Sequence, residues 1–458
     1  MVKSDTIAAI GTAVSSSGIG IIRISGPESF EIADQIFRAK NGKKIEEAKS
    51  HTIHYGHICD GDEVIDEVLV MVMKGPHSYT AEDTIEINCH GGVLMMKKIL
   101  ETVIRHGARP AEPGEYTKRA FLNGRIDLSQ AEAVIDVINA KNQYALQSSV
   151  SQLSGAVSKK IKELREMIIY HIAYIESALD DPEHISLDGY SEELSGVLRP
   201  VVKEVEKLVA SSDNGKVMSE GIKTVILGKP NAGKSSLMNV LAGEERAIVT
   251  DIAGTTRDTL EEHIRMQGIS LNVVDTAGIR DTEDVVEKIG VKKAKSAADE
   301  SDLIIYVVDG SCELDDNDQK IIDLIKDKKS IILLNKTDLN MVISKEELEK
   351  KTGQKVIPVS AKEVTGIEEL EKEIKSLFYQ GEIDFNDEVY ITNIRHKKAL
   401  TDALNSLNMV QESIDNGMPE DFYSIDLMDA YESLGSIIGE AVEDDLVNEI
   451  FSKFCMGK

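Results

Sequence analysis

A glycine-rich segment near the middle of the chain has the residue types and spacing of a phosphate-binding loop. The pattern G-x-x-x-x-G-K-[ST] is matched by Gly228-Lys229-Pro230-Asn231-Ala232-Gly233-Lys234-Ser235. Glycines let backbone N–H groups turn inward around phosphate, Lys234 reaches the β- and γ-phosphates, and the Ser235 hydroxyl ligates Mg²⁺. A glycine-rich turn that caps a helix is the alternative, and chance produces this pattern in roughly 1–2% of chains of this length.

Three further motifs each follow an apolar, strand-like run. Asp275-Thr276-Ala277-Gly278 places a carboxylate where it can hold Mg²⁺ through water. In Asn335-Lys336-Thr337-Asp338, the last carboxylate can accept hydrogen bonds from both N1–H and the 2-amino group of guanine, a pair that adenine cannot offer. Ser360-Ala361-Lys362 can support the base through its backbone and the Lys side chain. Each motif alone is common, but their order along the chain predicts a site for GTP.

These motifs resemble those of the translation-factor-related GTPases, in which catalysis consists of positioning and charge stabilisation at the phosphates. One position departs from Ras-like enzymes, because Ile279 stands where those enzymes have a water-positioning Gln. A hydrophobic side chain cannot orient water, so the polar catalytic group must come from another part of the chain.

A candidate switch loop lies between the phosphate-binding loop and the Asp275 motif. It reads Thr250-Asp251-Ile252-Ala253-Gly254-Thr255-Thr256-Arg257-Asp258. Thr256 is a candidate ligand of Mg²⁺, beside Ser235, and a sensor of the γ-phosphate. Together with Asn231, the loop resembles the potassium-activated TrmE-Era-EngA-like GTPases, above all the MnmE (TrmE) family of tRNA-modification GTPases.

The resemblance implies that K⁺ is held by Asn231, Thr250, Ile252 and Thr255. It also implies that Glu287 orients the attacking water, whereas spacing alone favours a solvated helix glutamate in a chain this acidic. The residues expected to contact GTP are Asn231, Ala232, Gly233, Lys234, Ser235, Ser236, Thr250, Asp251, Ile252, Ala253, Gly254, Thr255, Thr256, Asp275, Thr276, Ala277, Gly278, Asn335, Lys336, Asp338, Ser360, Ala361 and Lys362.

Three N-terminal segments are similar to the folate-binding domain of the same family. They are Ile21–Pro27, Ser78–Asp83 with the Glu86 and His90-Gly91-Gly92 that follow, and Pro113–Arg125. The resemblance implies that Arg23, Glu86, Arg125 and Lys458 bind 5-formyl- or methylene-tetrahydrofolate. A carboxylate can accept two hydrogen bonds from the aminopyrimidine edge of a pterin, and cations suit its glutamate tail. From the residues alone, a surface ion pair is the simpler interpretation of each.

The chain closes with Phe454-Cys455-Met456-Gly457-Lys458, which is similar to the cysteine-containing tail of the family. Cys455 has two interpretations that stay open. A thiol near a flexible terminus is a candidate nucleophile if its pKa is lowered. The alternative is a small apolar residue that packs a terminal helix.

Charge and cysteine usage exclude several classes of function. The net charge of −28 opposes non-specific attraction to nucleic acid or anionic membranes, so a partner or a local patch must hold any tRNA. The four cysteines show neither a disulfide framework nor zinc-site spacing, which favours a reducing cytoplasm. Neither a signal peptide nor an apolar run of membrane-spanning length is found.

The elements that must position these residues indicate a multidomain protein. Short strands and helices over residues 1–125 predict an N-terminal α+β domain for folate binding and dimerisation. Helical periodicity over residues 126–220 predicts the first part of a helical bundle, with a polar link at Ser211–Gly215. Alternating strands and helices over residues 221–380 predict an inserted α/β P-loop GTPase domain with a parallel sheet. Residues 381–458 return to helices and form the second part of the bundle.

The resemblance as a whole implies a potassium-stimulated GTPase that works as a homodimer with a flavin-containing, MnmG-like partner. The pair would add a carboxymethylaminomethyl-type group at the 5-carbon of the tRNA wobble uridine, with tRNA held mainly by the complex. A regulatory or ribosome-assembly GTPase switch is the alternative function, and the N-terminal block and the tail at Cys455 discriminate against it because a switch needs no folate site.

Overall fold

The computed structural model describes residues 5–140, 142–243, 261–266, 269–274, 296–378, 389–440, 444–454 and 457. The chain divides into two compact units. One comprises Met1–Ile138, Ser151–Val201 and Asp402–Lys458, and the other comprises Asn139–Val150 and Val202–Thr401.

The first unit begins with a seven-stranded sheet in the order β3-β4-β5-β6-β2-β1-β7. Neighbouring strands are antiparallel except for β1 and β7, which are parallel. The strands are β1 (Ile7–Ile10), β2 (Gly20–Ser25), β3 (Phe37–Ala39), β4 (Thr52–Asp60), β5 (Glu63–Met73), β6 (Thr84–Cys89) and β7 (Arg109–Pro110). The helices of this domain are α1 (Ser29–Ile36), α2 (Val93–Arg105) and α3 (Glu115–Leu122).

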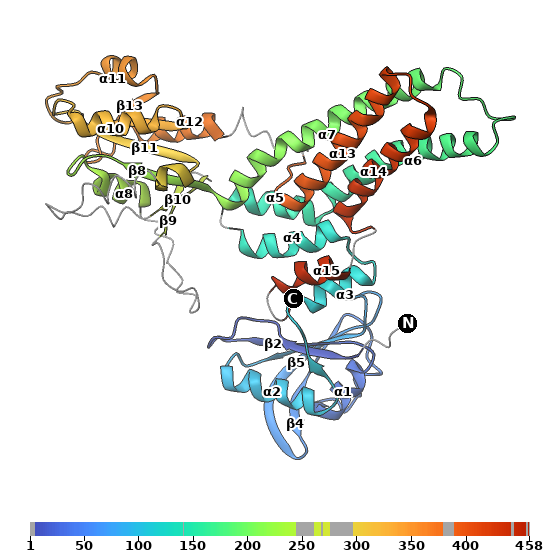
Figure 1. The fold of residues 1–458 in the computed structure, drawn as a ribbon. Helices are drawn as coiled ribbons and strands as arrows, with labels where there is room; N and C mark the ends of the chain where they lie inside the picture. The colour runs from blue at the N-terminus through green and yellow to red at the C-terminus, as the bar shows by residue number, and fades with distance from the viewer. Residues whose placement is uncertain are drawn as a thin grey trace. The chain divides into compact units, whose positions relative to one another are not determined.

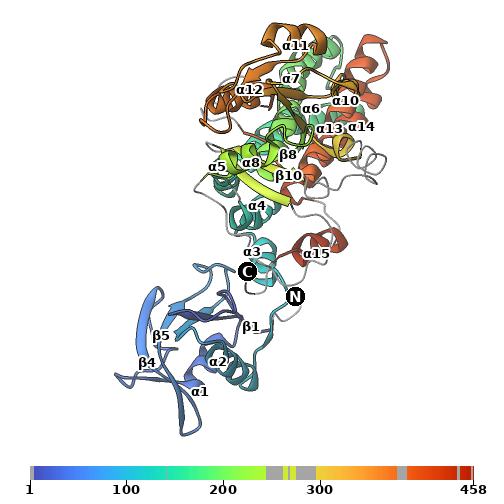
Figure 2. The same cartoon turned by 90° about the vertical axis from the view of Figure 1, so that its left-hand side faces the viewer.

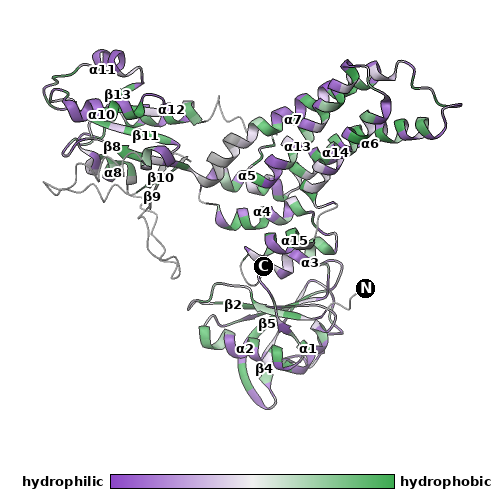
Figure 3. Cartoon of the chain, in the orientation of Figure 1, coloured by the Kyte–Doolittle hydropathy of each residue, from purple (hydrophilic) through white to green (hydrophobic). Residues whose placement is uncertain are grey.

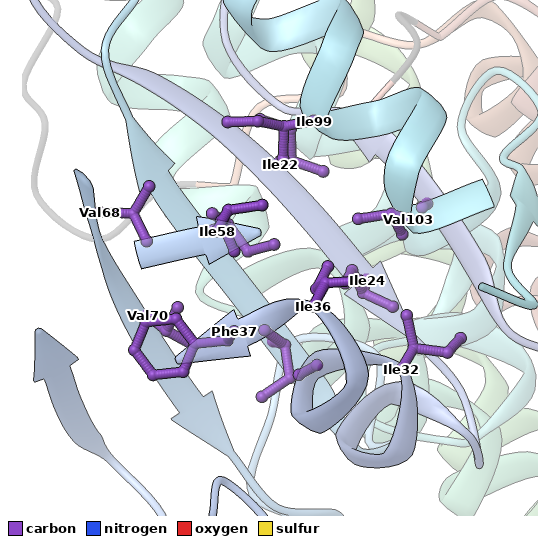
Figure 4. Packing of buried hydrophobic residues seen from close by; sticks show 14 of the residues in the cluster. Ile22, Ile24, Ile32, Ile36, Phe37, Ile58, Val68, Val70, Ile99 and Val103 are labelled. Atoms are coloured by element: carbon purple, nitrogen blue, oxygen red, sulfur yellow. The ribbon is translucent and has the colours of Figure 1, made fainter. Parts of the chain in front are cut away.

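Strand β2 separates the core of this domain from its candidate site. Its residues alternate between the two faces of the sheet. Ile22 and Ile24 are fully buried in the core that the sheet forms with α1 and α2 (Figure 4). Arg23, which lies between them, therefore points to the opposite face, where Tyr116 of α3 is buried with Ile7 and Ala9.

Helices make up the rest of the first unit. Their bounds are α4 (Leu128–Asn139), α5 (Gln143–Leu153), α6 (Ala156–Asp180), α7 (Tyr190–Glu220), α13 (Ile394–Asp415), α14 (Glu420–Ile438) and α15 (Asp444–Ser452), of which α5, α7 and α13 also contribute residues to the second unit. Helices α6 and α14 pack lengthwise, as both Figure 1 and Figure 2 show. None of the helices in the described ranges combines the length and apolar character needed to cross a bilayer.

The second unit contains a six-stranded sheet in the order β13-β12-β11-β8-β10-β9. All neighbours are parallel except β9 and β10. The strands are β8 (Ile222–Leu227), β9 (Glu261–Met266), β10 (Ile269–Val274), β11 (Leu303–Asp309), β12 (Ser330–Asn335) and β13 (Val356–Pro358). The helices are α8 (Lys234–Ala242), α10 (Asp316–Ile325), α11 (Lys345–Thr352) and α12 (Ile367–Phe378).

Both faces of this sheet are covered, so its central strands are apolar throughout. Leu237 of α8 and Leu370 of α12 pack on one face, and Ile322 of α10 and Leu348 of α11 pack on the other. In Figure 3, β8 is coloured as hydrophobic and α11 as mainly hydrophilic. This arrangement is the α/β layering that the alternating strands and helices predict.

One expected boundary is wrong. Residues 211–215, expected to be a polar link, lie inside α7, which continues to Glu220. The hydroxyls of Ser211 and Ser212 donate to the carbonyls of Leu208 and Val209, at 2.7 and 2.6 Å, so these polar residues are satisfied within the helix.

Candidate functional site

The phosphate-binding loop connects the end of β8 to the start of α8. Asn231 and Gly233 have positive φ angles of 62° and 98°, which turn the loop back over the N-terminus of the helix. The Lys234 ammonium donates to the carbonyls of Gly228 and Lys229, at 2.8 and 2.7 Å. A cation and a helix N-terminus therefore lie together, and this combination suits an anion such as a polyphosphate.

Asn335 joins this loop to the segment that follows β13. Its buried side-chain amide donates to the carbonyl of Ala232 at 2.8 Å, and its side-chain oxygen accepts from the backbone N–H of Ala361 at 3.1 Å. A Cβ atom at Gly233 would lie 2.1 Å from Nδ2 of Asn335, so only glycine fits there. The phosphate side and the base side of the candidate site are thus connected through one amide.

Asp338 is held by the segment that begins at Ser360. The buried Ser360 hydroxyl donates to a carboxylate oxygen of Asp338 at 2.8 Å. The Lys362 ammonium lies 4.0 Å from the other oxygen, although its own side chain is mostly exposed. Since Ser360 fixes the carboxylate, its remaining lone pairs are oriented before any base arrives, as a guanine-recognising group requires.

Asp309 is a site residue that sequence reasoning missed. It ends β11 beside Asn335 of β12, and the Lys336 ammonium binds its carboxylate at 2.5 Å. Partial burial opposes ionisation of Asp309, but hydrogen bonds from Lys336 and Ser311 outweigh it and keep the pKa of this carboxyl below its usual value. The signal was present, because an Asp-Gly pair at the end of an apolar run lies at the edge of the sheet where the motifs gather.

Lys229 anchors the outer part of the phosphate-binding loop. Its ammonium lies 3.0 Å from Asp315 and 2.7 Å from the buried Asp318 at the start of α10. Desolvation lowers the pKa of Lys229, but hydrogen bonds to these two carboxylates raise it further, so the net direction is upward. This second missed contact ties the loop to a helix on the opposite side from Asn335.

The described part of the GTP site comprises the residues from Asn231 to Ser236 and the two base-side segments. Ser235 and Ser236 are exposed at the first turn of α8. The remaining expected residues lie outside the described ranges: Thr250, Asp251, Ile252, Ala253, Gly254, Thr255, Thr256, Asp275, Thr276, Ala277, Gly278 and Glu287.

The N-terminal sheet brings three of the expected folate residues together. Arg23 on β2 and Glu86 on β6 are register partners, and the Arg23 Nε atom lies 2.7 Å from the Glu86 carboxylate. The Arg23 guanidinium also lies over the rings of Tyr79 and Tyr116, 5.5 and 5.4 Å from their centroids. Arg125 lies over the same Tyr79 ring at 4.9 Å.

The tail of the chain reaches the same place. Arg23 donates through Nη1 to the carbonyl of Gly457 at 3.1 Å. A Cβ atom at Gly457, whose φ is 91°, would lie 2.4 Å from the carbonyl oxygen of Ile10 on β1. Cys455 and Lys458 flank this glycine and lie outside the described residues.

A buried ion-pair network supports the segment that carries Arg125. Arg119 of α3 is paired with Asp5, Glu82 and Glu115, at 2.8, 3.1 and 3.0 Å. Burial lowers the pKa of Arg119, but these carboxylates outweigh it and raise the pKa above its ordinary value. Neither the network nor the two tyrosines followed from the sequence, because they depend on which residues α3 brings to the sheet.

The chain was compared with known proteins. A family model described as "MnmE helical domain" matches residues 128–455, and one described as "GTP-binding protein TrmE N-terminus" matches residues 6–125. The tRNA modification GTPase MnmE of Lachnoclostridium phytofermentans is 58% identical over 457 residues, covering 100% of both chains. The protein of the same name from Acetivibrio thermocellus is 52% identical over 466 residues, again covering 100% of both. Among solved structures, the G domain of the T. maritima FeoB iron transporter covers 34% of this chain and 97% of its own, at 26% identity and a TM-score of 0.27.

Proposed function

Because the chain belongs to the MnmE family of tRNA modification GTPases, we propose that it uses GTP hydrolysis to drive modification of the tRNA wobble uridine. Working with a flavin-containing, MnmG-like partner, it adds a carboxymethylaminomethyl-type group at the 5-carbon. The observation that carries the nucleotide part is the Asn335 amide, which holds the phosphate-binding loop and the base-side segment in one unit.

The chain is a GTPase, and its own residues supply positioning and charge. Backbone N–H groups of the loop and the Lys234 ammonium bind the β- and γ-phosphates, and Asp338 accepts from the guanine edge. Ser235 and Thr256 are the residues proposed to hold Mg²⁺. Asn231, Thr250, Ile252 and Thr255 are those proposed to hold K⁺, whose charge beside the β/γ bridge replaces an arginine finger. Glu287 is proposed to orient the attacking water.

Folate binding is proposed at the face of the N-terminal sheet that carries Arg23. A carboxylate, two guanidinium groups and two tyrosine rings lie within reach of one another there, which suits a flat heterocycle with a hydrogen-bonding edge. Glu86 binds the pterin edge, while Arg23, Arg125 and Lys458 bind anionic groups. The bound tetrahydrofolate, in its 5-formyl or methylene form, supplies the one-carbon unit, and Cys455 is a candidate nucleophile beside it.

The proposed organisation follows the sequence: a folate-binding and dimerisation domain at residues 1–125, and a helical domain at 126–220 and 381–458 into which the GTPase domain at 221–380 is inserted. The protein acts as a homodimer in the cytoplasm. With a net charge of −28, it leaves most of the affinity for tRNA to the partner.

Nucleoside analysis of tRNA from cells that lack the protein tests this proposal. The wobble modification should disappear, wild-type protein should restore it, and Glu287→Ala should not. Purified protein should also turn over GTP faster in K⁺ than in Na⁺ at equal ionic strength. An unchanged nucleoside profile would refute the tRNA function and point to a regulatory or ribosome-assembly switch.

A further inference from the structure

The hairpin of α13 and α14 carries an apolar hollow that neither the GTP site nor the folate site uses. Its volume is about 310 Å³, and its apolar wall is made by Met409, Met418, Phe422 and Ile425. These side chains are unusually open for their type, since Ile425 is 61% exposed and Met409 is 50% exposed. Single exposed apolar residues are ordinary, but a hollowed group of four indicates a surface that something covers.

The hollow has a fixed shape because the hairpin turn is well bonded. The backbone N–H groups of Gly417 and Met418 donate to the carbonyls of Ile414 and Ser413, at 3.0 and 2.9 Å, which closes the end of α13. The Tyr423 hydroxyl donates to the Met418 carbonyl at 2.8 Å. A docking surface held in this way loses little conformational entropy on binding.

A buried carboxylate lines the same hollow. Asp426 is only 9% exposed. Among the described residues it accepts no hydrogen bond and forms no ion pair, which is costly for a buried charged group. Burial, with the nearby charge of Asp429, raises the pKa of Asp426 above its usual value. A cation delivered into the hollow would supply the missing partner.

The surroundings fix the sign of what binds. From residue 399 to residue 452 the sequence contains thirteen Asp and Glu residues and no Lys, Arg or His. Glu412 stands in the wall of the hollow itself. A basic occupant would be attracted, and another copy of this acidic chain would be repelled.

We propose that the hollow between α13 and α14 is a docking site for an amphipathic, basic helix of a partner protein. One apolar side chain of that helix fills the hollow, and a Lys or Arg one turn away pairs with Asp426. Exposed apolar surface continues past the hollow to Met428, so the contact extends over more than a small molecule would cover. Methionine side chains suit such a surface because they adapt to the shape of an incoming helix.

Fluorescence anisotropy with a synthetic peptide tests the proposal on the full-length protein. The probe is an amphipathic helix of about 18 residues with Leu at i, i+3, i+4 and i+7 and Lys beside them, and its matched control has Glu in place of Lys. The Lys peptide should bind and the Glu peptide should not. Hydrogen exchange should show new protection within residues 409–428. Protection elsewhere, or equal binding of the two peptides, would overturn the proposal.

Matched variants separate the site from general acidity. Asp426→Asn and Ile425→Ser should each weaken binding about tenfold or more, because truncating one side of a buried charge pair or apolar contact raises the off-rate. Asp421→Asn removes an exposed carboxylate outside the hollow, and Leu179→Ser removes an exposed apolar side chain on α6. Both controls should bind as the wild type does, and control losses equal to those of the site variants would refute the site.

Two more measurements keep the outcome clear. GTP turnover should be the same in all four variants, so a change in binding cannot be assigned to the nucleotide site. Light scattering should give the same mass for wild type and Ile425→Ser. A lower mass for the variant would mean that a second copy of this chain covers the hollow, which would overturn the proposal of a basic partner.

Discussion

The side-chain amide of Asn335 donates to the carbonyl of Ala232 across 103 positions of sequence, at 2.8 Å, while its oxygen accepts from Ala361. Two loops that touch opposite ends of a nucleotide are thereby fixed to one buried group. Movement of the phosphate-binding loop and movement of the base-side segment are not independent, because either one breaks a bond to the same side chain.

Asn335→Asp tests this coupling. The substitution keeps the acceptor for Ala361 but replaces the donor with a carboxylate oxygen that faces the Ala232 carbonyl. The affinity for GDP should fall by about 1–3 kcal/mol, the cost of an unsatisfied buried polar group. Isothermal titration calorimetry measures it, with Asn317→Asp on the exposed start of α10 as the control. If both variants bind GDP equally, Asn335 does not organise the site.

Gly233→Ala should abolish nucleotide binding, because the new Cβ atom would lie 2.1 Å from the Asn335 amide. Gly353→Ala is a matched control, since Gly353 also has a positive φ, of 69°, but nothing lies within 4 Å of its Cβ position. Both variants carry the backbone strain of an L-residue there, so only the difference reports the steric clash. Binding of a fluorescent GDP analogue to Gly233→Ala at the level of Gly353→Ala would contradict this account.

Asp338→Asn should move specificity from guanine to xanthine nucleotides. Asn keeps an oxygen that can accept from the Ser360 hydroxyl, so the side chain stays in place, but its NH₂ group now faces the base and donates. The ratio of XTP to GTP turnover should rise by roughly 100-fold or more, since both acceptor contacts to the base are lost. A variant that still prefers GTP would show that another residue recognises the base.

Glu86→Gln should weaken binding of 5-formyltetrahydrofolate by about tenfold or more, because the charged acceptor for the pterin edge is lost. Glu63→Gln is the control on the same sheet. Glu63 also pairs with a basic side chain, that of Lys98, but it is 63% exposed. Calorimetry with the intact protein measures both. Equal affinities would return the Arg23–Glu86 pair to a purely structural role.

Asp426→Asn should stabilise the first unit, and the gain should depend on pH. Burial, Asp429 and the acidic wall raise the folded-state pKa of Asp426 above that of the unfolded chain, so between these two pKa values the folded state binds more protons. Stability of the wild type therefore falls as pH rises from about 4 through this interval, and the fall then levels off. Thermal melts should show Tm of the variant exceeding that of wild type at pH 7 and converging with it at acid pH. A lower Tm for the variant at pH 7 would mean that Asp426 already has a partner.

The nucleotide site was largely predictable, because each motif follows an apolar strand and parallel strands end at one edge of the sheet. The contacts that lock the site were not. Asp309 and Lys336 pair only because β11 and β12 are neighbours in register, which spacing along the chain does not encode.

The error at residues 211–215 has a definite physical cause. Ser, Asp, Asn and Gly favour loops when they are considered locally. Here the two serine hydroxyls bond back to the helix, and a Cβ atom at Gly215 would lie 2.1 Å from the Ile391 carbonyl. Gly215 therefore marks a close approach of a distant segment rather than a break, and a single sequence cannot distinguish the two.

The bond between Arg23 and Gly457 spans 434 positions and has a consequence for biosynthesis. At roughly 5–20 residues per second, a ribosome needs on the order of 20 to 90 s to travel from one to the other. The sheet that carries Arg23 emerges early, but its guanidinium must wait for nearly the whole polypeptide to be translated before it meets that carbonyl. Prematurely terminated chains could fold the sheet and still lack this bond, so its formation distinguishes a finished product from an abortive one.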